Sequence, residues 1–189
     1  AQSARLVQEN MALTQLADRL REESTVDALT GLYNRRHLDQ VLTRELSLAV
    51  RAGHGVGVSL LDMDHFKLLN DTFGHVAADR VLRGVADYLR ARLRVYDIPC
   101  RYGGEEIVVV VPGARTRDAF TLAEQLRQGI ERLSVVHAGK VVTPITASFG
   151  VSTFPRHGVD ASQLLQAADA ALYASKSDGR NKVTIAPVC

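Results

Sequence analysis

The sequence contains little cysteine, no tryptophan and no long apolar run, and the shortage of cysteine and of apolar runs excludes whole classes of protein. Its two cysteines, Cys100 and Cys189, belong to no CxxC pair and have no histidine at zinc-ligand spacing. We therefore expect free thiols in a reducing compartment, with the cytoplasm as the location. No apolar run approaches the roughly 18 residues that span a bilayer, and no charged and apolar leader opens the chain. Attachment of a longer parent protein to a membrane stays open.

Charge of one sign is not in excess either. The 189 residues hold 23 Lys and Arg against 21 Asp and Glu, which gives a formal net charge of +2. Bulk attraction to nucleic acid or to an anionic membrane is therefore not indicated, and any anion site must be local. A nucleic-acid binder is the least favoured class, because the arginines of "RARLR" have no aromatic residues between them.

An apolar content of 46% suits one well-packed domain with a short appendage. We expect the appendage over residues 1–26 and the domain over residues 27–189. Residues 1–24 contain no glycine or proline, and leucines at positions 6, 13, 16 and 20 approximate a heptad seam. Such a helix buries little alone, so we expect a partner helix in a homodimer or an upstream sensory domain, with an ordinary packing helix as the alternative.

Helices alternate with apolar strands in the rest of the chain, and one hairpin stands in the middle. This order predicts an α/β fold in which a central mixed sheet is covered by helices. Asp160 is placed to cap the last helix, and the glycines of the "GGEE" hairpin are expected to supply positive φ. We expect helices over residues 34–49, 81–94, 119–133 and 160–172, and strands over residues 55–64, 98–102, 107–111, 143–154 and 181–185.

Acidic residues stand where two of the expected strands meet loops. Asp62 and Asp64 end the strand over residues 55–64, while Glu105 and Glu106 form the hairpin tip before four valines. If those strands are neighbours, three or four carboxylates converge, and their repulsion favours a divalent cation. Oxygen ligands without histidine or cysteine favour Mg²⁺ or Mn²⁺ over zinc. Acids that only terminate strands and solvate loops are the alternative.

Basic residues lie in segments that adjoin these acids. Lys67 follows the aspartates closely, and "KSDGRNK" places Lys176, Arg180 and Lys182 around a glycine turn after the last helix. These cations could grip a polyphosphate, although a solvated helix end is the commoner meaning of such a segment.

The segment "DHFKLLNDTFGH" carries two further binding features. It offers backbone amides in a loop before a helix, a setting that suits phosphate. Asn70 and Asp79 supply an amide and a carboxylate, which can read the hydrogen-bonding edge of a purine, guanine especially. An exposed acid on a helix is the alternative for Asp79.

Five motifs in one order resemble those of the GGDEF-domain diguanylate cyclases. The resemblance covers about residues 27–185, and it implies the nucleotidyl-cyclase fold, which is similar to a polymerase palm. The motifs are "DALTGLYNRR" (27–36), "LDMDHFKLLNDTFGH" (61–75), "RYGGEEI" (101–107), "ASFGVS" (147–152) and "ADAALYASKSDGRNKV" (168–183).

The resemblance implies a role for each matching residue. The metal ligands would be Asp62, the backbone carbonyl of Met63 and Glu105, with Glu106 as a further ligand or acid. The residues implied for the substrate are Asn70 and Asp79 for guanine, Phe66 and Lys67 for the phosphate loop, Lys176 and Arg180 for the terminal phosphates, and Gly103 and Gly104 for close approach of the nucleotide.

The resembled reaction joins two GTP molecules into cyclic di-GMP and releases two pyrophosphates. Each 3′-hydroxyl attacks the α-phosphate of the opposing GTP, with magnesium activating the nucleophile and stabilising the developing charge. One domain holds one GTP, so two domains must face each other. A homodimer through the N-terminal helix, or cross-linking by the product, would bring them together.

A second nucleotide site is implied by "RVYD". Arg94 and Asp97 match the family's RxxD motif, which binds the product and inhibits the enzyme. A local ion pair at a helix end is the alternative.

Two residues depart from the family pattern. Ile107 stands where the family usually has Phe, and Ala78 replaces a glycine near the expected guanine pocket. The first change should repack within a buried strand, and the second adds a methyl group that could narrow the pocket. An active cyclase is the favoured function. A catalytically silent cyclic di-GMP receptor and a magnesium-dependent cyclase or palm enzyme for other nucleotides are the alternatives.

Overall fold

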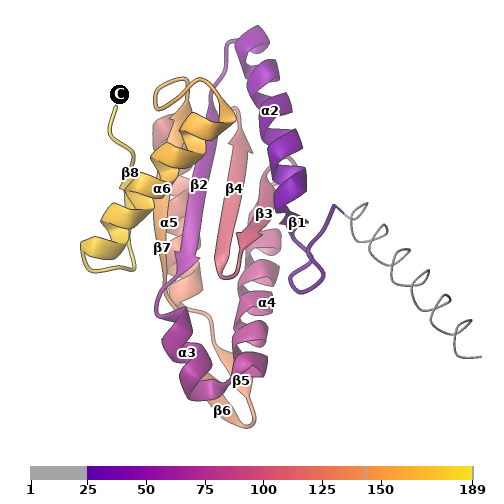
Figure 1. Ribbon diagram of the computed structural model, residues 1–189, viewed down its shortest axis with the longest axis vertical. Helices are drawn as coiled ribbons and strands as arrows, with labels where there is room; N and C mark the ends of the chain where they lie inside the picture. The colour runs from indigo at the N-terminus through magenta and orange to yellow at the C-terminus, as the bar shows by residue number, and fades with distance from the viewer. Residues whose placement is uncertain (1–24, 143, 189) are drawn as a thin grey trace, which may run out of the picture.

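A mixed sheet of six strands runs through residues 25–142 and 144–188, the part of the chain that the computed structural model describes (Figure 1). Its order is β1-β3-β4-β2-β7-β8. The pairs β1–β3 and β7–β8 are parallel, and the three inner pairs are antiparallel, which confirms the expected mixed sheet. The strands are β1 Tyr33–Asn34, β2 Val56–Met63, β3 Ile98–Gly103, β4 Glu106–Pro112, β7 Ala147–Phe154 and β8 Val183–Ile185.

Helices cover both faces of this sheet. In Figure 1, α2 (Arg35–Ala52) and α6 (Ala161–Ser177) lie in front of the strands, and α5 (Thr116–Glu131) lies behind them. Helix α4 (His75–Arg92) packs with α5 in the same apolar core, and the short helix α3 (Phe66–Phe73) connects β2 to α4. The layers are therefore helix, sheet and helix.

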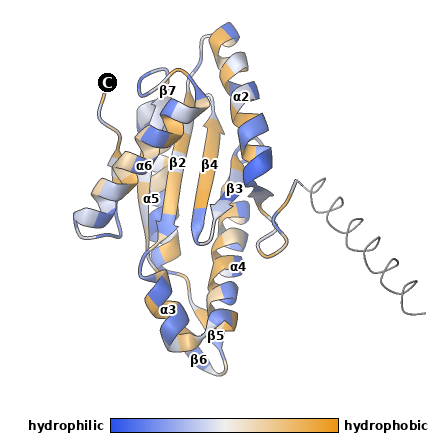
Figure 2. Cartoon of the chain, in the orientation of Figure 1, coloured by the Kyte–Doolittle hydropathy of each residue, from blue (hydrophilic) through white to orange (hydrophobic). Residues whose placement is uncertain are grey.

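Alternation along the strands divides the apolar side chains between two cores. On β2, Leu60 belongs to the core under α2 and α6, whereas Leu61 belongs to the core under α4 and α5. On β4, Val108 and Val109 are divided in the same way. Because side chains on a strand alternate between faces, Asp62 and Glu106 lie on the face of Leu60 and Val108, which α6 covers. Figure 2 shows that both strands are apolar along their length and polar at this end.

The predicted helices and strands are present, and their caps agree with the sequence. The Asp160 side chain accepts a hydrogen bond from the Gln163 N–H, as expected, and Asn34 caps α2 in the same way through the N–H of His37. Gly53 ends α2 in the left-handed conformation, with φ 70°.

Three parts of the chain differ from the prediction. Residues 66–73 form helix α3, where a loop was expected. Gly74, with φ 82°, separates α3 from α4, and the chain is helical on both sides of it. A second sheet, the hairpin of β5 (Val135–His137) and β6 (Lys140–Val142), was not predicted. The strand expected from residue 143 begins at Ala147.

Some predictions fall on residues outside the description. The heptad helix over residues 1–24 and the thiol of Cys189 belong to this group, and the boundary between appendage and domain stays a prediction. Cys100 is a buried free thiol, as expected, and burial raises its pKa to about 12. No helix within the described ranges is long and apolar enough to cross a membrane.

Candidate active site at the ends of strands β2 and β4

The register of β2 and β4 brings acidic residues from distant parts of the chain together. Asp62 pairs with Glu106, one step beyond the pair of Leu61 with Ile107. The Met63 N–H donates to the carbonyl oxygen of Glu105 at 3.4 Å, so the hairpin tip is tied to the end of β2. The expectation that these strands are neighbours and bring carboxylates together is confirmed.

A lysine from α6 lies directly on this acidic pair. The Lys176 Nζ is 2.9 Å from the Oδ2 of Asp62, and the two side chains are 34% and 10% exposed. Burial raises the pKa of Asp62; the hydrogen bond and charge of Lys176 offset this only in part, and the charge of Glu105 adds to the rise. Burial also raises the pKa of Glu106, with repulsion from Asp62 as the next cause. The site therefore holds more negative charge than its lysine neutralises.

The expectation was that three or four acids converge, and Asp64 differs from the other three in having its own set of hydrogen-bond donors. Its Oδ1 accepts from the Ser148 hydroxyl at 2.7 Å, and its Oδ2 accepts from the Thr146 hydroxyl at 2.8 Å and from the Asn181 N–H at 3.0 Å. These bonds bury Asp64 in a structural role. Asp62 and Glu106 are paired across the strands, and the charges of both Glu105 and Asp64 add to the rise in the pKa of Asp62.

The remaining acids fit a hard divalent cation. Within residues 25–142 and 144–188, no group of three or more Asp, Glu, His or Cys side chains is arranged to hold a metal by itself. Magnesium is commonly held by one or two carboxylates, with substrate phosphates and water completing its shell. The oxygen-only donors and the surplus charge at Asp62 and Glu106 match that need, and zinc would require ligands that the site lacks.

The hairpin tip is shaped by a bulge, and the expectation of positive φ at its glycines is wrong. The register shifts between Arg101 and Gly103, so one extra residue on β3 bends the strand, and neither Gly103 nor Gly104 is left-handed. A Cβ at Gly104 would meet nothing within 4 Å, and one at Gly103 would meet the Oε2 of Glu106 at 3.3 Å. The glycines therefore leave the tip open, as close approach of a ligand requires.

An arginine that the prediction missed holds this tip. The Arg101 guanidinium donates to the carbonyl oxygen of Gly104 at 2.8 and 3.1 Å, and to the carboxylate of Asp27 at 3.0 and 3.1 Å. Burial alone would raise the pKa of Asp27, but the hydrogen bonds of Thr30 and the pairing with Arg101 lower it. The turn at Asp27, which precedes β1, is thus bonded to the glycine tip.

The expected phosphate loop begins as the N-terminus of α3. His65, with φ 55°, precedes the helix and gives it no side-chain cap. Phe66 is only 8% exposed, so it can offer a ligand its backbone, whereas Lys67 is exposed. An uncapped helix N-terminus beside the acidic pair is a suitable place for phosphate.

The two residues expected to read a purine lie on adjoining helices. Asn70 is on α3 and Asp79 is on α4, on either side of Gly74, and both are half-buried. The Oδ1 of Asn70 is buried and has no hydrogen-bond partner among the described residues. A buried acceptor without a partner is costly, so it favours a ligand donor at this point.

The RxxD residues interact through the backbone. The Arg94 N–H donates to the Oδ2 of Asp97 at 2.9 Å, and no ion pair joins the two side chains within the described ranges. Asp97 is buried, and Arg94 is exposed. Both line a cavity of about 630 Å³, together with Arg92 and Arg117. Arg94 thus lines a cavity that holds two further arginines as well as the carboxylates of Asp97 and Asp118.

The two departures from the family pattern lie in the apolar core. Ile107 is 1% exposed, which agrees with the expected repacking in a buried strand. Ala78 is also 1% exposed and belongs to the core under α4 and α5. Its effect on a guanine pocket stays a prediction.

Residues 24–182 match the family described as diguanylate cyclase, GGDEF domain. The response regulator PleD of Caulobacter vibrioides is 41% identical over 164 residues, which are 86% of this chain and 36% of that protein. The diguanylate cyclase VdcA of Vibrio cholerae is 39% identical over 167 residues, 87% of this chain and 48% of that protein. The chain thus spans less than half the length of these curated relatives.

Solved structures agree with this match. The GGDEF domain of DgcB from Caulobacter crescentus, in complex with c-di-GMP, superposes with a TM-score of 0.81 at 34% identity, over 85% of this chain and 92% of that one. The diguanylate cyclase SiaD from Pseudomonas aeruginosa, in complex with its activator SiaC, superposes with a TM-score of 0.82 at 38% identity, over 98% and 71% of the two chains.

Proposed function

The chain belongs to the GGDEF-domain diguanylate cyclase family, and we propose that it is an active member, which condenses two GTP molecules into cyclic di-GMP and two pyrophosphates. The observation that carries the proposal is the pairing of Asp62 with Glu106 across β2 and β4, with Lys176 2.9 Å from Asp62. A silent receptor needs neither the carboxylates nor the lysine. Their retention in one place favours catalysis.

The acidic residues serve a metal-assisted transfer. Asp62, the Met63 carbonyl and Glu105 would hold Mg²⁺ or Mn²⁺, with Glu106 as a further ligand or acid. When bound, that cation activates the attacking 3′-hydroxyl and stabilises charge on the α-phosphate. Lys176 balances the charge of Asp62 before substrate binds, and its flexible ammonium can turn to a terminal phosphate afterwards.

The remaining site residues bind and orient GTP. The buried Oδ1 of Asn70 accepts from a guanine N–H, and Asp79 accepts from the same edge of the base. The amides of Phe66 and Lys67 face the phosphates at the N-terminus of α3. Arg180 joins Lys176 on the terminal phosphates, and the open backbone at Gly103 and Gly104 lets the nucleotide lie close.

Two chains must face each other, because each site holds one GTP. A homodimer through residues 1–26 would raise the effective concentration of one site at the other. An upstream sensory domain of the full-length protein would control that effective concentration. The cavity at Arg94 and Asp97 would bind cyclic di-GMP as an inhibitor, since exposed guanidinium groups there can grip its phosphates and guanines.

The test is to incubate the chain with GTP and magnesium and to separate the nucleotides by chromatography. The expected result is cyclic di-GMP from the natural chain and none from Asp62→Ala or Glu105→Ala. A folded, dimeric sample that makes no product would overturn the proposal, and tight binding of cyclic di-GMP by that sample would favour a receptor. Arg94→Ala should release product inhibition while leaving the initial rate unchanged.

Base selectivity is tested separately by comparing GTP with ATP as ligands. Asn70→Ala is expected to lower the preference for GTP about tenfold, because a site that reads a polar edge loses its discrimination with that group. The exposed neighbour Asp71→Ala serves as the control and should leave the preference unchanged. An Asn70→Ala chain with undiminished selectivity would remove Asn70 from the guanine site.

A further inference from the structure

The turn that follows α6 has an unusual backbone. Gly179, Arg180 and Asn181 have successive φ values of 97°, 62° and 46°, so two of the three left-handed residues carry side chains. Such residues are uncommon outside glycine and persist only where the surroundings fix them. Interactions with the surrounding structure must therefore fix this turn.

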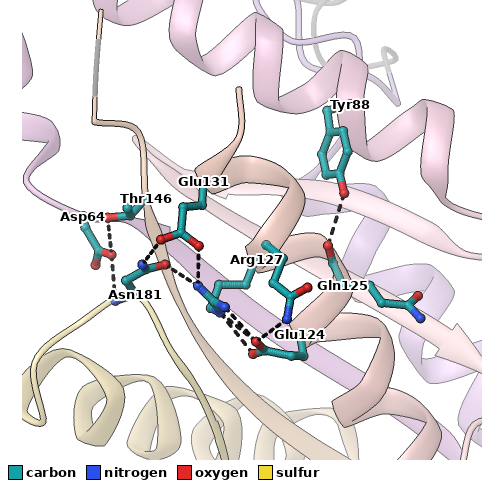
Figure 3. Close-up of polar contacts among 9 residues, drawn as sticks. Asp64, Tyr88, Glu124, Gln125, Arg127, Glu131, Thr146 and Asn181 are labelled. Atoms are coloured by element: carbon teal, nitrogen blue, oxygen red, sulfur yellow. Dashed lines mark hydrogen bonds and ion pairs between the residues drawn. The ribbon is translucent and has the colours of Figure 1, made fainter. Parts of the chain in front are cut away.

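Asn181 makes those interactions with its backbone N–H and with both the oxygen and the nitrogen of its side-chain amide. Its backbone N–H donates to the Oδ2 of Asp64 at 3.0 Å, beyond the end of β2. Its Oδ1 accepts from the Arg127 Nη1 at 2.7 Å, and its Nδ2 donates to the Oε1 of Glu131 at 2.8 Å (Figure 3). The backbone N–H of Asn181 thus joins the turn to the residue that follows β2, and its side-chain amide joins the turn to α5.

The partners on α5 are themselves held firmly. The Arg127 side chain, 12% exposed, donates to both carboxylate oxygens of Glu124 at 2.7 to 3.1 Å and to Glu131 at 3.1 Å. Hydrogen bonding to Glu124 raises the pKa of Arg127, and hydrogen bonding from Asn181 lowers the pKa of Glu131. The network is therefore ionised and rigid where Asn181 meets it.

The turn carries Arg180, one cation of the proposed GTP site, and it directly follows the last turn of α6, which carries the other, Lys176. Arg180 directly precedes Asn181, and its N–H donates to the carbonyl oxygen of Ser175 at 3.0 Å, beside Lys176. Lys176 pairs with Asp62, and Asn181 bonds to Asp64, two residues further along the chain. The segment is thus fastened at both ends to the same end of β2.

We propose that Asn181 is a positioning residue, which holds Lys176 and Arg180 where the terminal phosphates of GTP bind. The inference rests on the proposed function, because it needs that substrate. Long cationic side chains lose conformational freedom on binding, and a turn that is already fixed reduces this loss. Asn181 should therefore strengthen binding of the phosphates without affecting binding of the nucleoside.

The test compares ligands that differ only in phosphate. Asn181→Gly keeps the left-handed backbone available and removes both side-chain bonds. Calorimetry with GTP, guanosine and inorganic pyrophosphate, in magnesium, is expected to show about tenfold weaker GTP and pyrophosphate binding and unchanged guanosine binding. The control Gln128→Ala removes a 3.0 Å bond to Glu124 on the same helix and should change none of the three.

A second variant guards against loss of the fold. Arg127→Met keeps the length of an apolar stem and removes the bond to the Oδ1 of Asn181 together with the bonds to Glu124 and Glu131, so a melting curve first establishes that the variant is folded. About threefold weaker GTP binding is then expected, with guanosine unchanged. Equal weakening of GTP and guanosine, or no weakening in either variant, would overturn the positioning role. If the natural chain binds GTP no better than guanosine, the proposed function fails first and takes this role with it.

Discussion

The carboxylates and the cations of the candidate site are held by different interactions. Asp62 and Glu106 lie on paired strands, where the backbone ladder of β2 and β4 fixes their spacing. Arg180 lies in a left-handed turn, which is fixed by the side chain of Asn181. The spacing of the carboxylates should therefore withstand side-chain changes nearby, whereas the position of the cationic turn depends on a few polar bonds.

The hairpin tip lies between these two extremes. Its strands are paired as far as Gly103 and Glu106, but the bulge between Arg101 and Gly103 interrupts the ladder, and Gly104 lies in the turn between the strands. Arg101 supplies the missing restraint by bonding both to Gly104 and to Asp27. The strand side of the site is therefore also connected to the turn at Asp27 that precedes β1.

The largest expected effect separates two aspartates of the strand side. Asp62→Asn should lower cyclic di-GMP formation at least about 100-fold, since it removes the charge of a proposed metal ligand. The same change should raise thermal stability without metal, because the pKa of Asp62 is already raised by burial. Asp64→Asn should instead cost about 2 kcal/mol of unfolding free energy, because the three groups that donate to Asp64 would lose their charged acceptor. Melting curves and product assays measure both, and a less stable Asp62→Asn chain would contradict the comparison.

The next effect tests the restraint on the tip. Arg101→Met should lower kcat/KM about tenfold by loosening Gly104. It should also cost about 2 kcal/mol in chemical denaturation, because Asp27 loses its charged partner. Asp27→Asn is the control that keeps the bonds from Arg101 to Gly104, so it should lower stability and spare most of the activity. Equal losses of activity in the two variants would show that the tip bond is not what matters.

Two glycines, one on each side of the site, allow a test with a smaller expected change in stability. A Cβ would meet nothing within 4 Å at either Gly179 or Gly104, but only Gly179, with φ 97°, is left-handed. Gly179→Ala should therefore cost about 1 kcal/mol of unfolding free energy. Gly104→Ala should stay within about 0.5 kcal/mol and instead raise the KM for GTP. The reverse order of stabilities would refute the assigned backbone roles.

The smallest expected effect is on the pH dependence of the strand side. The folded pKa of Asp62 lies above its usual 3.8, so its contribution to stability is complete below that value and is lost as the pH rises through the folded pKa. Asp62→Asn should therefore flatten the fall in metal-free stability with rising pH. Magnesium binding should strengthen over the same range, because it needs the ionised form. Denaturant titrations from pH 3 upwards test the first expectation and calorimetry the second; a parallel pH profile in the two chains would exclude Asp62 as the source.

Local patterns allowed most of the fold to be predicted. Period-3.6 apolar stripes and the cap at Asp160 gave the long helices, and the valines after Glu106 gave a buried strand. The β5–β6 hairpin was missed, although "VVHAGKVV" places valines on both sides of a two-residue turn. In the structure the turn residues Ala138 and Gly139 both have positive φ, as such a hairpin turn requires. Short helices such as α3 are harder, because eight residues show only two turns of periodicity.

The site residues divide in the same way. Carboxylates at strand ends are visible in the sequence, and so is the pairing of Asp62 with Glu106 once two strands are neighbours. The role of Asp64 is not visible, because its partner Asn181 is 117 residues away and its hydroxyl donors are 82 and 84 away. No local pattern predicts which of the two aspartates pairs with Lys176 and which accepts hydrogen bonds from distant donors.

The order of elements, the two buried strands and the family of the chain could all be predicted before the structure was known. These follow from periodicity, caps and motifs, which act over a few residues. The tertiary structure decided that Arg101 restrains the glycine tip, that Asp64 is structural and that Asn181 fixes the cationic turn. Those roles depend on hydrogen bonds between segments far apart in the chain, whose geometry exists only after the sheet and its helices have packed.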